Sequence, residues 1–403
     1  MKGLLDGVTV LDLTRVVSGP SCTRSLADLG AEVIKIEPPE GDMWRRGLPR
    51  VGNVSVGFAQ MNAGKRFLSV DLRTKKGQEI VFKLALQCDV IVENYRPGVA
   101  AKLGLGYEAI SKEKPEIIYC SISGYGQEGP ARGRRAYAPI IHAEVGLLHQ
   151  NAREWGIAPL AESASHADIG VGMQASIGIL AALFNRQVTG EGVHVDASMA
   201  ETMLAMNEST AVETNGGLAG KMSPFRPGKA PVVKVKNGDY AQLPGNPSTM
   251  IFAVARAFGK AAELEALGWT SPTAMTVEEA AAKLSEWALE FDDVDSLGAA
   301  LDSIRVPVGA VKPLADSANA DWAIYSKAFT DVDSHDGTIK VPTSPLRVSN
   351  HQVGPRGGAY ALGDDNRALL KARLGLDDDE IDMLEKEDVL ISERNQETDS
   401  SPF

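Results

Sequence analysis

Asp168 is the residue whose setting most directly raises a question of chemistry. It stands in "ASHADIGVGMQASIGILAALFNRQVTG" (residues 164–190), where a polar lead-in meets a long apolar run. A carboxylate with an ordinary pKa near ~3.9 is ionised at neutral pH and can act as a nucleophile. Aspartate is also among the residues that most often cap a helix N-terminus. From the residues alone, capping is the simpler interpretation, and nucleophilic attack is the alternative.

Basic residues gather in three short stretches of the first half of the chain. In an acidic protein such clusters can form a local anion site, for example for a nucleotide that carries several phosphates. The residues are Lys65, Arg66, Arg73, Lys75 and Lys76 in "GKRFLSVDLRTKKG", Arg96 and Lys102 in "NYRPGVAAKLG", and Arg132, Arg134 and Arg135 in "RGRR". Taken singly, each cluster is explained as well by ordinary solvated side chains.

Signatures of several other protein classes are missing. The turn "TRVVSGPSC" lacks the G-x-G-x-x-G spacing of a nicotinamide or flavin site, and no Walker A sequence occurs. "SISGYG" does not fit the G-x-S-x-G elbow of a serine hydrolase. The six histidines show no metal-ligand spacing, so we expect no metal. The net charge of -12 argues against a general nucleic-acid binder, which needs a basic face.

Strand and helix patterns alternate through the first third of the chain. "VTVLDLT", "AEVIKIE", "DVIVEN" and "EIIYCSISGYG" have the character of strands, and "GPSCTRSLADLG" and "KKGQEIVFKLALQ" have the character of helices. This order predicts parallel βαβ units. Ligands of such sheets bind at the carboxyl ends of the strands. We therefore expect the site among the loops at residues 15–20, 37–46, 94–98 and 123–135.

The length of 403 residues exceeds that of one compact domain, so we expect two lobes. Residues from about 169 to 187 should form a long apolar helix closed by Gly190. The pattern breaks into glycine and proline at residues 215–231, which marks a boundary. After it we expect a smaller α+β lobe to about residue 320, with a capping box of Thr276 and Glu279. The polar tail "SERNQETDSSPF" should be disordered.

The three cysteines, Cys22, Cys88 and Cys120, lie in apolar stretches. An odd, sparse set is not a disulfide framework, so we expect buried thiols in a reducing compartment. The chain does not open with a secretory signal pattern, and it holds no run of about 18 apolar residues. These features favour a cytoplasmic protein with no membrane span, and an organelle matrix is the alternative.

Long blocks of the sequence, in the same order, resemble the family III CoA-transferases, the group that contains formyl-CoA, carnitine and bile-acid CoA-transferases. The blocks are "LDGVTVLDLTRVVSGPSCTRSLADLGAEVIKIEPPEGD", "NAGKRFLSVDLRTKKG", "DVIVENYRPGVAAKLGLGYEAI", "IIYCSISGYGQEGP", "DIGVGMQASIGILAALFNRQVTGEGVHVDASMAE" and "YALGDDNRALLKARLGLDDDEIDML". The resemblance covers nearly the whole chain and is weakest at about 215–330. Several ordered blocks are a more specific signal than any single short motif.

The resemblance implies an α/β fold with a Rossmann-like parallel-sheet large domain, built from both chain ends, and an inserted small α+β domain. On this chain the large domain would begin with residues 1–215 and resume at 330–403 with a C-terminal helix and tail. Residues 225–325 would form the small domain. The family architecture also implies a homodimer in which two chains interlock as linked rings.

The resemblance assigns Asp168 as the catalytic nucleophile, so the chemical interpretation is preferred to the cap. We expect the carboxylate to project away from its own helix end. Positions implied to bind CoA are Val16, Leu72, Lys75, Asn94, Tyr95, Lys102, Leu103 and Arg135, and Tyr137 falls where these transferases place an active-site tyrosine. Lysine and arginine suit phosphates through charge-assisted hydrogen bonds.

The implied reaction moves CoA from an acyl-CoA donor to a small free carboxylic acid through acyl-aspartyl and aspartyl-CoA intermediates on Asp168. CoA enters as substrate, and no prosthetic group is expected. Glycine-rich stretches at residues 215–217 and 243–247 are candidates for stabilising oxyanions. Arg45 and Arg46 either hold a second carboxylate, which would suit a dicarboxylate such as succinate, or lie on the surface.

The sequence departs from its relatives at informative positions. Val17 stands where formyl-CoA transferases carry a glutamine, which argues against oxalate and formate as substrates. Racemases of the family have Gly-His-Asp where this chain has Tyr137 and Ala138, so the second acid/base group that racemisation needs is missing. Nearby histidines are His142, His149 and His166, the last most simply a surface or supporting imidazole. An α-methylacyl-CoA racemase-type isomerase and a silent CoA-binding protein remain the alternatives.

Overall fold

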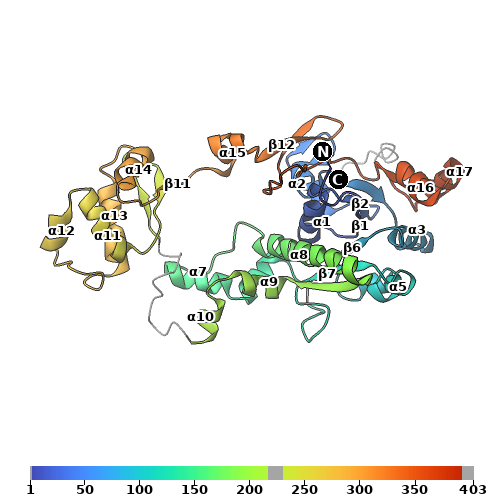
Figure 1. Ribbon diagram of the computed structural model, residues 1–403, viewed down its shortest axis with the longest axis horizontal. Helices are drawn as coiled ribbons and strands as arrows, with labels where there is room; N and C mark the ends of the chain where they lie inside the picture. Colours follow the sequence, from blue (N-terminus) through green and yellow to red (C-terminus); the bar gives the residue numbers. More distant parts are fainter. Residues whose placement is uncertain (1, 217–229, 393–403) are drawn as a thin grey trace. The chain divides into compact units, whose positions relative to one another are not determined.

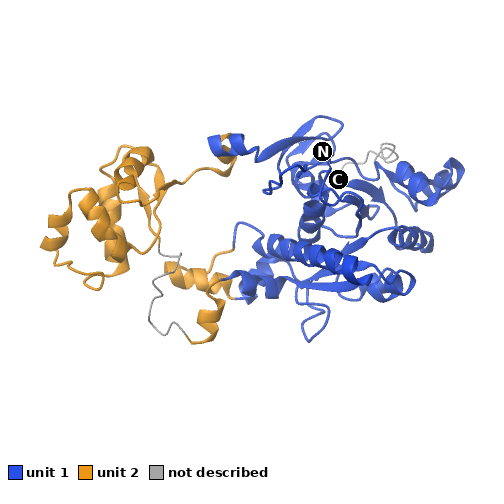
Figure 2. Ribbon diagram, viewed as in Figure 1, with its two compact units in different colours: residues 1–145, 162–207, 321–403 blue, residues 146–161, 208–320 orange. Residues whose placement is uncertain are grey.

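The computed structural model describes residues 2–216 and 230–392. The chain divides into two compact units (Figure 2). Unit 1 comprises residues 1–145, 162–207 and 321–403, so both ends of the chain contribute to it. Unit 2 comprises residues 146–161 and 208–320. Most of the expected boundary at 215–231 and the expected disordered tail lie outside the described residues.

Unit 1 is built on a six-stranded sheet in the order β5-β2-β1-β6-β7-β8 (Figure 1). Every neighbouring pair is parallel, which confirms the α/β prediction. Strands β1, β6 and β7 are buried along their whole length, as expected for parallel strands that are covered on both faces. The strands are β1 (Thr9–Asp12), β2 (Glu32–Glu37), β5 (Arg66–Ser69), β6 (Val90–Glu93), β7 (Ile118–Ser123) and β8 (Val193–Ser198).

The strand order reverses beside β1. From β1 the chain proceeds to β2 and then β5 on one side, and it returns to β6, β7 and β8 on the other. Loops that leave β1 and β6 therefore diverge to opposite sides of the sheet. This arrangement is the topological switch point at which open α/β sheets bind their ligands, outside the carboxyl ends of the strands.

Helices and two short antiparallel ribbons complete unit 1. Helix α8 packs against α1, α6, α9, β7 and β8. The helices are α1 (Ser18–Asp28), α2 (Val56–Asn62), α3 (Lys75–Ala85), α4 (Val99–Lys102), α5 (Tyr107–Glu113), α6 (Ala138–Glu144), α8 (His166–Thr189), α9 (Met199–Met206), α15 (Asp321–Ser326), α16 (Asn366–Leu374) and α17 (Asp378–Lys386), with a 3-10 turn at Met43–Arg46. The ribbons pair β3 (Arg50–Val51) with β4 (Val54–Ser55) and β12 (Phe329–Asp333) with β13 (Thr338–Pro342).

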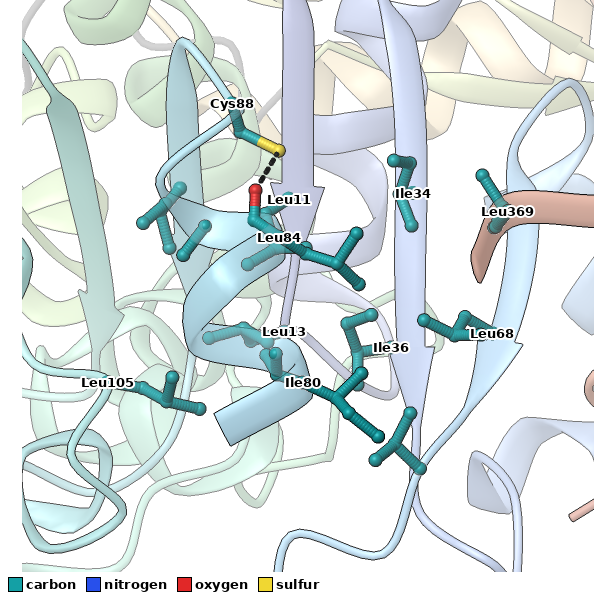
Figure 3. Close-up of a cluster of buried hydrophobic side chains, with 14 of the residues drawn as sticks. Leu11, Leu13, Ile34, Ile36, Leu68, Ile80, Leu84, Cys88, Leu105 and Leu369 are labelled. Atoms are coloured by element: carbon teal, nitrogen blue, oxygen red, sulfur yellow. Dashed lines mark hydrogen bonds between the residues drawn. The ribbon is translucent and has the colours of Figure 1, made fainter. Parts of the chain in front are cut away.

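A cluster of buried leucine and isoleucine side chains joins the sheet to helix α3 (Figure 3). Helix α3 contributes Ile80 and Leu84, which lie one turn apart on its buried face. Leu369 of α16 belongs to the same cluster, although it is distant in sequence. The C-terminal segment is also tied to β5, because the Asn366 side chain accepts the Ser69 N–H at 2.9 Å. These contacts explain why both chain ends belong to unit 1.

Three buried ion pairs lie at the carboxyl end of the sheet or next to it. They join Lys65 to Asp12 at 2.9 Å, Lys35 to Asp42 at 3.4 Å and Arg45 to Glu37 at 2.7 Å. Asp12 and Glu37 are the last residues of β1 and β2. Buried charges are tolerated because each is paired and hydrogen-bonded. The network therefore gives the loops above it a rigid, charged base. All three cysteines are buried, as predicted.

Unit 2 has its own core around the buried Trp287. The predicted capping box is confirmed, since the Thr276 hydroxyl accepts the Glu279 N–H at 3.1 Å while the Glu279 carboxylate accepts the Thr276 N–H at 2.7 Å. An antiparallel sheet, β11-β10-β9, consists of β9 (Val232–Lys234), β10 (Tyr240–Gln242) and β11 (Gly309–Ala310). The helices are α7 (Leu147–Trp155), α10 (Thr210–Thr214), α11 (Pro247–Ala257), α12 (Ala261–Ala266), α13 (Val277–Ala288) and α14 (Val294–Asp302), with a 3-10 turn at Leu314–Asn319.

Helix α8 is apolar on two faces. Among the described residues, it is the one helix long and apolar enough to cross a membrane by length and composition, and 50% of its most apolar window is buried inside the protein. The buried face packs on α1 and the sheet. The other face carries an exposed apolar stripe, whose members are four or seven residues apart: Ile169, Met173, Ile177, Phe184 and Val188. The helix ends, as predicted, with Gly190 in a left-handed conformation.

Candidate active site at the start of helix α8

Asp168 is not the cap of α8. The helix begins at His166, earlier than the predicted start near residue 169, and Ser165 is the N-cap. Asp168 therefore lies within the first turn, where the positive end of the helix dipole favours a carboxylate. The carboxylate is hydrogen-bonded to Ser18 of α1. Its contact with another helix agrees with the expectation that it projects away from its own helix end.

Burial raises the pKa of Asp168 from 3.8 to about 6, and the hydrogen bond from Ser18 opposes part of that rise. Water would stabilise the ionised form, and partial burial removes some of that water. A carboxylate in this state is still mostly ionised at neutral pH. Perturbed values of this kind are a feature of functional sites, so the electrostatics favour a chemical role for Asp168.

Close packing of α1 against α8 brings Ser18 to Asp168. A Cβ atom at Gly172 would lie 2.1 Å from the Ser21 Oγ and 2.8 Å from the Ser18 carbonyl oxygen. Only glycine allows this approach without displacing α1. Because side chains four residues apart lie on one face of a helix, Asp168 sits one turn before Gly172 on the side that faces α1.

The loop between β1 and α1 is clamped at the switch point by Asn94, which follows β6. The Asn94 amide oxygen accepts the Arg15 N–H at 3.0 Å. Its amide nitrogen donates to the Arg15 carbonyl at 2.9 Å and to the Ser18 Oγ at 3.1 Å. Asn94 and Asp168 thus contact the same hydroxyl, so a residue predicted to bind CoA is linked through Ser18 to the predicted nucleophile.

Val16 occupies the centre of this loop in a strained conformation. Its φ of 71° is in the left-handed region, which β-branched residues rarely adopt. The Val16 N–H donates to the Asp42 carboxylate at 3.0 Å, and Lys35 in turn pairs with Asp42. The buried ion pair therefore holds the loop in its shape.

Most of the predicted CoA-binding residues follow the carboxyl ends of strands. Val16 comes after β1, Leu72 and Lys75 after β5, and Asn94 and Tyr95 after β6. The side chains of Leu72, Tyr95 and Leu103 all pack against the hydrophobic cluster of Figure 3. Burial also raises the pKa of Tyr95 to about 12, so its hydroxyl stays protonated. These three side chains therefore extend the core of unit 1.

The predicted phosphate-binding cations are exposed. Lys75 is the first residue of α3, and Lys102 is the last residue of α4. Arg135 lies in the loop before α6, and Tyr137 is the N-cap of α6 with 59% of its surface exposed. Exposure leaves all four side chains accessible to a ligand, and none is held in an ion pair among the described residues.

Arg45 does not match either sequence interpretation. It is buried, donates to the Glu37 carboxylate at 2.7 Å, and stacks 3.8 Å from the centre of the Phe58 ring. A guanidinium engaged in this way is not free to hold a substrate carboxylate, and it is not a surface side chain. Arg46 is exposed.

His142 and His166 have different environments. His142 of α6 is 1% exposed, and its Nε2 accepts the Ala167 N–H at 3.1 Å. His166 is on the surface, with its Nε2 3.7 Å from the Glu162 carboxylate. Sequence reasoning missed the contacts that Ser18 and His142 make beside Asp168. No periodic pattern links them, because the three residues come from separate helices.

The glycine-rich stretches proposed to stabilise oxyanions belong to unit 2, apart from Gly217, which lies outside the described residues. Within the described parts of the chain, no group of three or more His, Cys, Asp or Glu side chains could hold a metal ion. The polar groups that the structure places together at the start of α8 include the Asp168 carboxylate, the Ser18 hydroxyl and the His142 imidazole.

The sequence model of CoA-transferase family III matches residues 5–366. The succinyl-CoA:glutarate CoA-transferase of Mus musculus is 33% identical over 94% of this chain and 88% of its own length. The acetyl-CoA:oxalate CoA-transferase of Acetobacter aceti is 31% identical over 92% of this chain and 96% of its own. Among solved structures, a CAIB/BAIF family protein from Brucella suis superimposes with a TM-score of 0.80 at 29% identity, and the match covers 93% of this chain and 100% of that one.

Proposed function

The chain belongs to CoA-transferase family III and is a CoA-transferase, and from this premise we propose that it moves CoA between two carboxylic acids with Asp168 as the nucleophile. The observation that carries the proposal is the setting of Asp168. It is a partly buried carboxylate in the first turn of α8, does not cap its helix, and has a pKa raised to about 6. Such a group is ionised at neutral pH but incompletely solvated, which favours nucleophilic attack.

The proposed reaction needs only the carboxylate and CoA itself. An Asp168 oxygen attacks the thioester carbonyl, the C–S bond breaks, and a mixed anhydride and the CoA thiolate form. The thiolate attacks the Asp168 carbonyl, which gives an aspartyl-CoA thioester and releases the donor acid. The acceptor carboxylate then attacks this thioester, the C–S bond breaks, and a second mixed anhydride and the CoA thiolate form. The thiolate attacks the acceptor carbonyl of this anhydride, which gives the acceptor's CoA thioester. Asp168 is regenerated, and each step exchanges one acyl bond for another.

The racemase alternative is disfavoured by the contacts of His142. Its Nε2 lone pair is occupied by the Ala167 N–H, so the other ring nitrogen must carry the proton. A ring in this state has no free lone pair with which to remove a substrate proton. Tyr137 stands in the position of the racemase histidine, and a phenol is a weaker general base than an imidazole at neutral pH.

One experiment distinguishes the transferase from its alternatives. Acyl-CoA donors are incubated with a panel of carboxylic acids, and products are followed by mass spectrometry. We expect CoA transfer to at least one acid, a borohydride-trapped thioester on the peptide that contains Asp168, and no deuterium at the α-carbon of a 2-methylacyl-CoA. Rapid deuterium incorporation without a trapped adduct would establish the racemase, and the absence of any turnover would leave a CoA-binding protein.

We propose a small dicarboxylic acid as one of the two substrates, with succinyl-CoA the first donor to test. Relatives from mouse, Haloarcula hispanica and Chloroflexus aurantiacus are named for succinyl-CoA. Val17, in the position of the formyl-CoA transferase glutamine, argues against oxalate. Arg46 is exposed, whereas Arg45 is committed to Glu37, so only Arg46 of this pair remains a candidate for a second carboxylate.

Lys75, Lys102 and Arg135 are proposed to bind the phosphates of CoA. Changing any one of them to alanine should weaken CoA binding by roughly 1.5–3 kcal/mol where the charged hydrogen bond is direct. Added salt should also weaken binding by wild type. Calorimetry measures both effects, and Lys83→Ala, at the far end of α3, is the control expected to bind normally. Unchanged affinity in all three variants would show that these cations are merely solvated.

A homodimer is proposed from the exposed stripe of α8, since large exposed apolar patches usually mark interaction surfaces. We expect an interface on the order of several thousand Å². Ile177→Glu, which places a charge in the stripe, should shift the mass measured by light scattering towards the monomer. Gln174→Glu adds the same charge at an exposed polar position of α8 and should leave the dimer intact. A monomeric wild-type protein at micromolar concentration would disprove the dimer.

A further inference from the structure

His142 is a buried titratable side chain that the proposed reaction does not use. It lies in α6, is 1% exposed, and accepts the backbone N–H of Ala167 on its Nε2 at 3.1 Å. Its Nδ1 is also buried and has no partner among the described residues. Buried polar atoms are nearly always paired, so the contact at Nε2 is the polar interaction that can account for the placement of this ring.

The Ala167 N–H needs an acceptor from outside its own helix. The first four N–H groups of a helix have no intrahelical partner, and side chains or water usually satisfy them. The N-cap of α8, Ser165, makes no side-chain capping bond. His142 therefore performs the capping role from a different helix, at the residue immediately before Asp168.

The contact defines the protonation state of His142. An acceptor nitrogen must keep its lone pair, so the proton lies on Nδ1 and the ring is neutral. A doubly protonated ring would turn an N–H towards the Ala167 N–H at the positive end of a helix dipole, which is unfavourable. Burial lowers the pKa of His142 and so favours the neutral ring.

We propose that His142 is a positioning residue for Asp168: its neutral imidazole holds the backbone at Ala167 and so sets the direction of the carboxylate. The proposal rests on the function proposed above. Asp168 is then held on two sides, by Ser18 at its carboxylate and by His142 at the preceding peptide. A displacement of about 1 Å in a reacting group can cost on the order of a hundredfold in rate, so this support should affect turnover.

Besides burial, two ionisable neighbours of His142 shift its pKa. After burial, His166 is the next cause of the lowered pKa, and its ring lies 5.8 Å from that of His142, while Glu162 acts in the opposite direction. Glu144 of α6 and Glu201, in the first turn of the adjoining α9, are not among the groups that shift the pKa. His142 thus titrates separately from Asp168, whose own pKa responds to burial and Ser18.

Two substitutions separate positioning from packing. His142→Leu removes the acceptor and should lower kcat by about tenfold or more, with the KM for acyl-CoA within about twofold of wild type. His142→Gln presents an amide oxygen to the Ala167 N–H and should recover kcat to within about threefold. His149→Leu changes an exposed histidine of α7 and should have no effect. A His142→Leu enzyme with wild-type kcat would overturn the proposal.

The pH profile supplies a measurement that a purely structural role would not change. Protonation of either Asp168 or His142 inactivates wild type, so the slope of log kcat against pH should approach 2 in the most acidic range. In His142→Gln it should approach 1. Equal slopes in the two proteins would count against the proposal, and this comparison remains available if His142→Leu does not fold.

Nitrogen NMR of the full-length protein tests the assignment without turnover. We expect His142 to be neutral with its proton on Nδ1 at neutral pH, and a proton on Nε2 would contradict the geometry. This result does not depend on substrate. A protein that shows the expected tautomer but transfers CoA to no acid would refute the proposed function and leave the His142 contact established.

Discussion

Asp168→Ala should abolish CoA transfer, with turnover at least about a thousandfold below wild type, while CoA still binds. The reaction as proposed passes through two covalent states of this one carboxylate, and no other described side chain beside it can form them. Steady-state kinetics measures the first effect and calorimetry with CoA the second. A variant that retains a tenth of wild-type turnover would exclude the covalent role.

A matched control comes from an aspartate that does cap a helix. Asp377 is the N-cap of α17, where it accepts the Glu380 N–H at 2.9 Å within a capping box. Asp377→Ala should lower the free energy of unfolding by about 1 kcal/mol and leave turnover unchanged. If Asp168→Ala instead behaved like Asp377→Ala, losing stability but not turnover, the carboxylate would be structural after all.

Removing the charge of Asp168 should raise the free energy of unfolding, whereas Asp377→Ala should lower it. Its folded pKa of about 6 lies above the ordinary 3.8, so the carboxylate favours unfolding increasingly as pH rises through that window. The full difference corresponds to at most about 3 kcal/mol, and partial solvent access should reduce it to about 1–2 kcal/mol. Asp168→Asn should therefore raise the free energy of unfolding at pH 8 but not at pH 3, measured by chemical denaturation.

Asp12→Ala should destabilise the protein by about 3–5 kcal/mol, because it breaks a buried ion pair by removing one partner. Asp12 is fully buried, accepts from Lys65 Nζ at 2.9 Å, and also accepts from the Thr14 and Thr23 hydroxyls. Removing it leaves the Lys65 ammonium buried without its carboxylate. Loss of the Asp12 carboxylate should also make the loop at Val16 less ordered, so the affinity for CoA should fall as well.

The sign of the pH dependence follows from the pKa of Asp12. Burial opposes ionisation, but the ammonium groups of Lys65 and Lys35 outweigh it and hold the pKa below its ordinary value. The contribution of Asp12 is therefore complete above about pH 4 and is lost as the pH falls, so wild type and variant should converge in acid. Urea denaturation across pH tests this convergence.

An exposed ion pair of the same unit provides the comparison. Glu387 pairs with Lys76 on the surface, with 41% and 56% of the two side chains exposed. Glu387→Ala should change the free energy of unfolding by less than about 1 kcal/mol. If Asp12→Ala and Glu387→Ala lowered the free energy of unfolding by similar amounts, burial would not be what makes the Asp12–Lys65 pair important for stability.

Local patterns in the sequence were sufficient for the architecture of unit 1. Alternating strand and helix runs predicted a parallel sheet, and the direction of parallel strands then placed the loops after β1, β5 and β6 at one edge. Hydrogen bonding between residues three apart likewise predicted the Thr276–Glu279 capping box. These features depend on periodicity and on groups close in the chain, which a sequence displays directly.

The start of α8 was predicted less accurately, and the error concerned the site. The apolar run begins at Ile169, whereas the helix begins at His166, because His142 satisfies the Ala167 N–H from α6. A partner from another helix adds a first turn that apolar periodicity cannot reveal. The same limit explains Arg45, whose buried pair with Glu37 cannot be distinguished in the sequence from a surface arginine.

By itself, the sequence determined the parallel sheet, the edge to which its loops run and the aspartate to examine. Tertiary structure alone decided what that aspartate is: a first-turn carboxylate with a raised pKa, held by Ser18 from α1, rather than a helix cap. The physical reason is that a residue's role depends on desolvation and on hydrogen-bond partners. Ser18, Asn94 and Asp168 lie far apart in the chain, and packing at Gly172 and the reversal of strand order beside β1 bring them together.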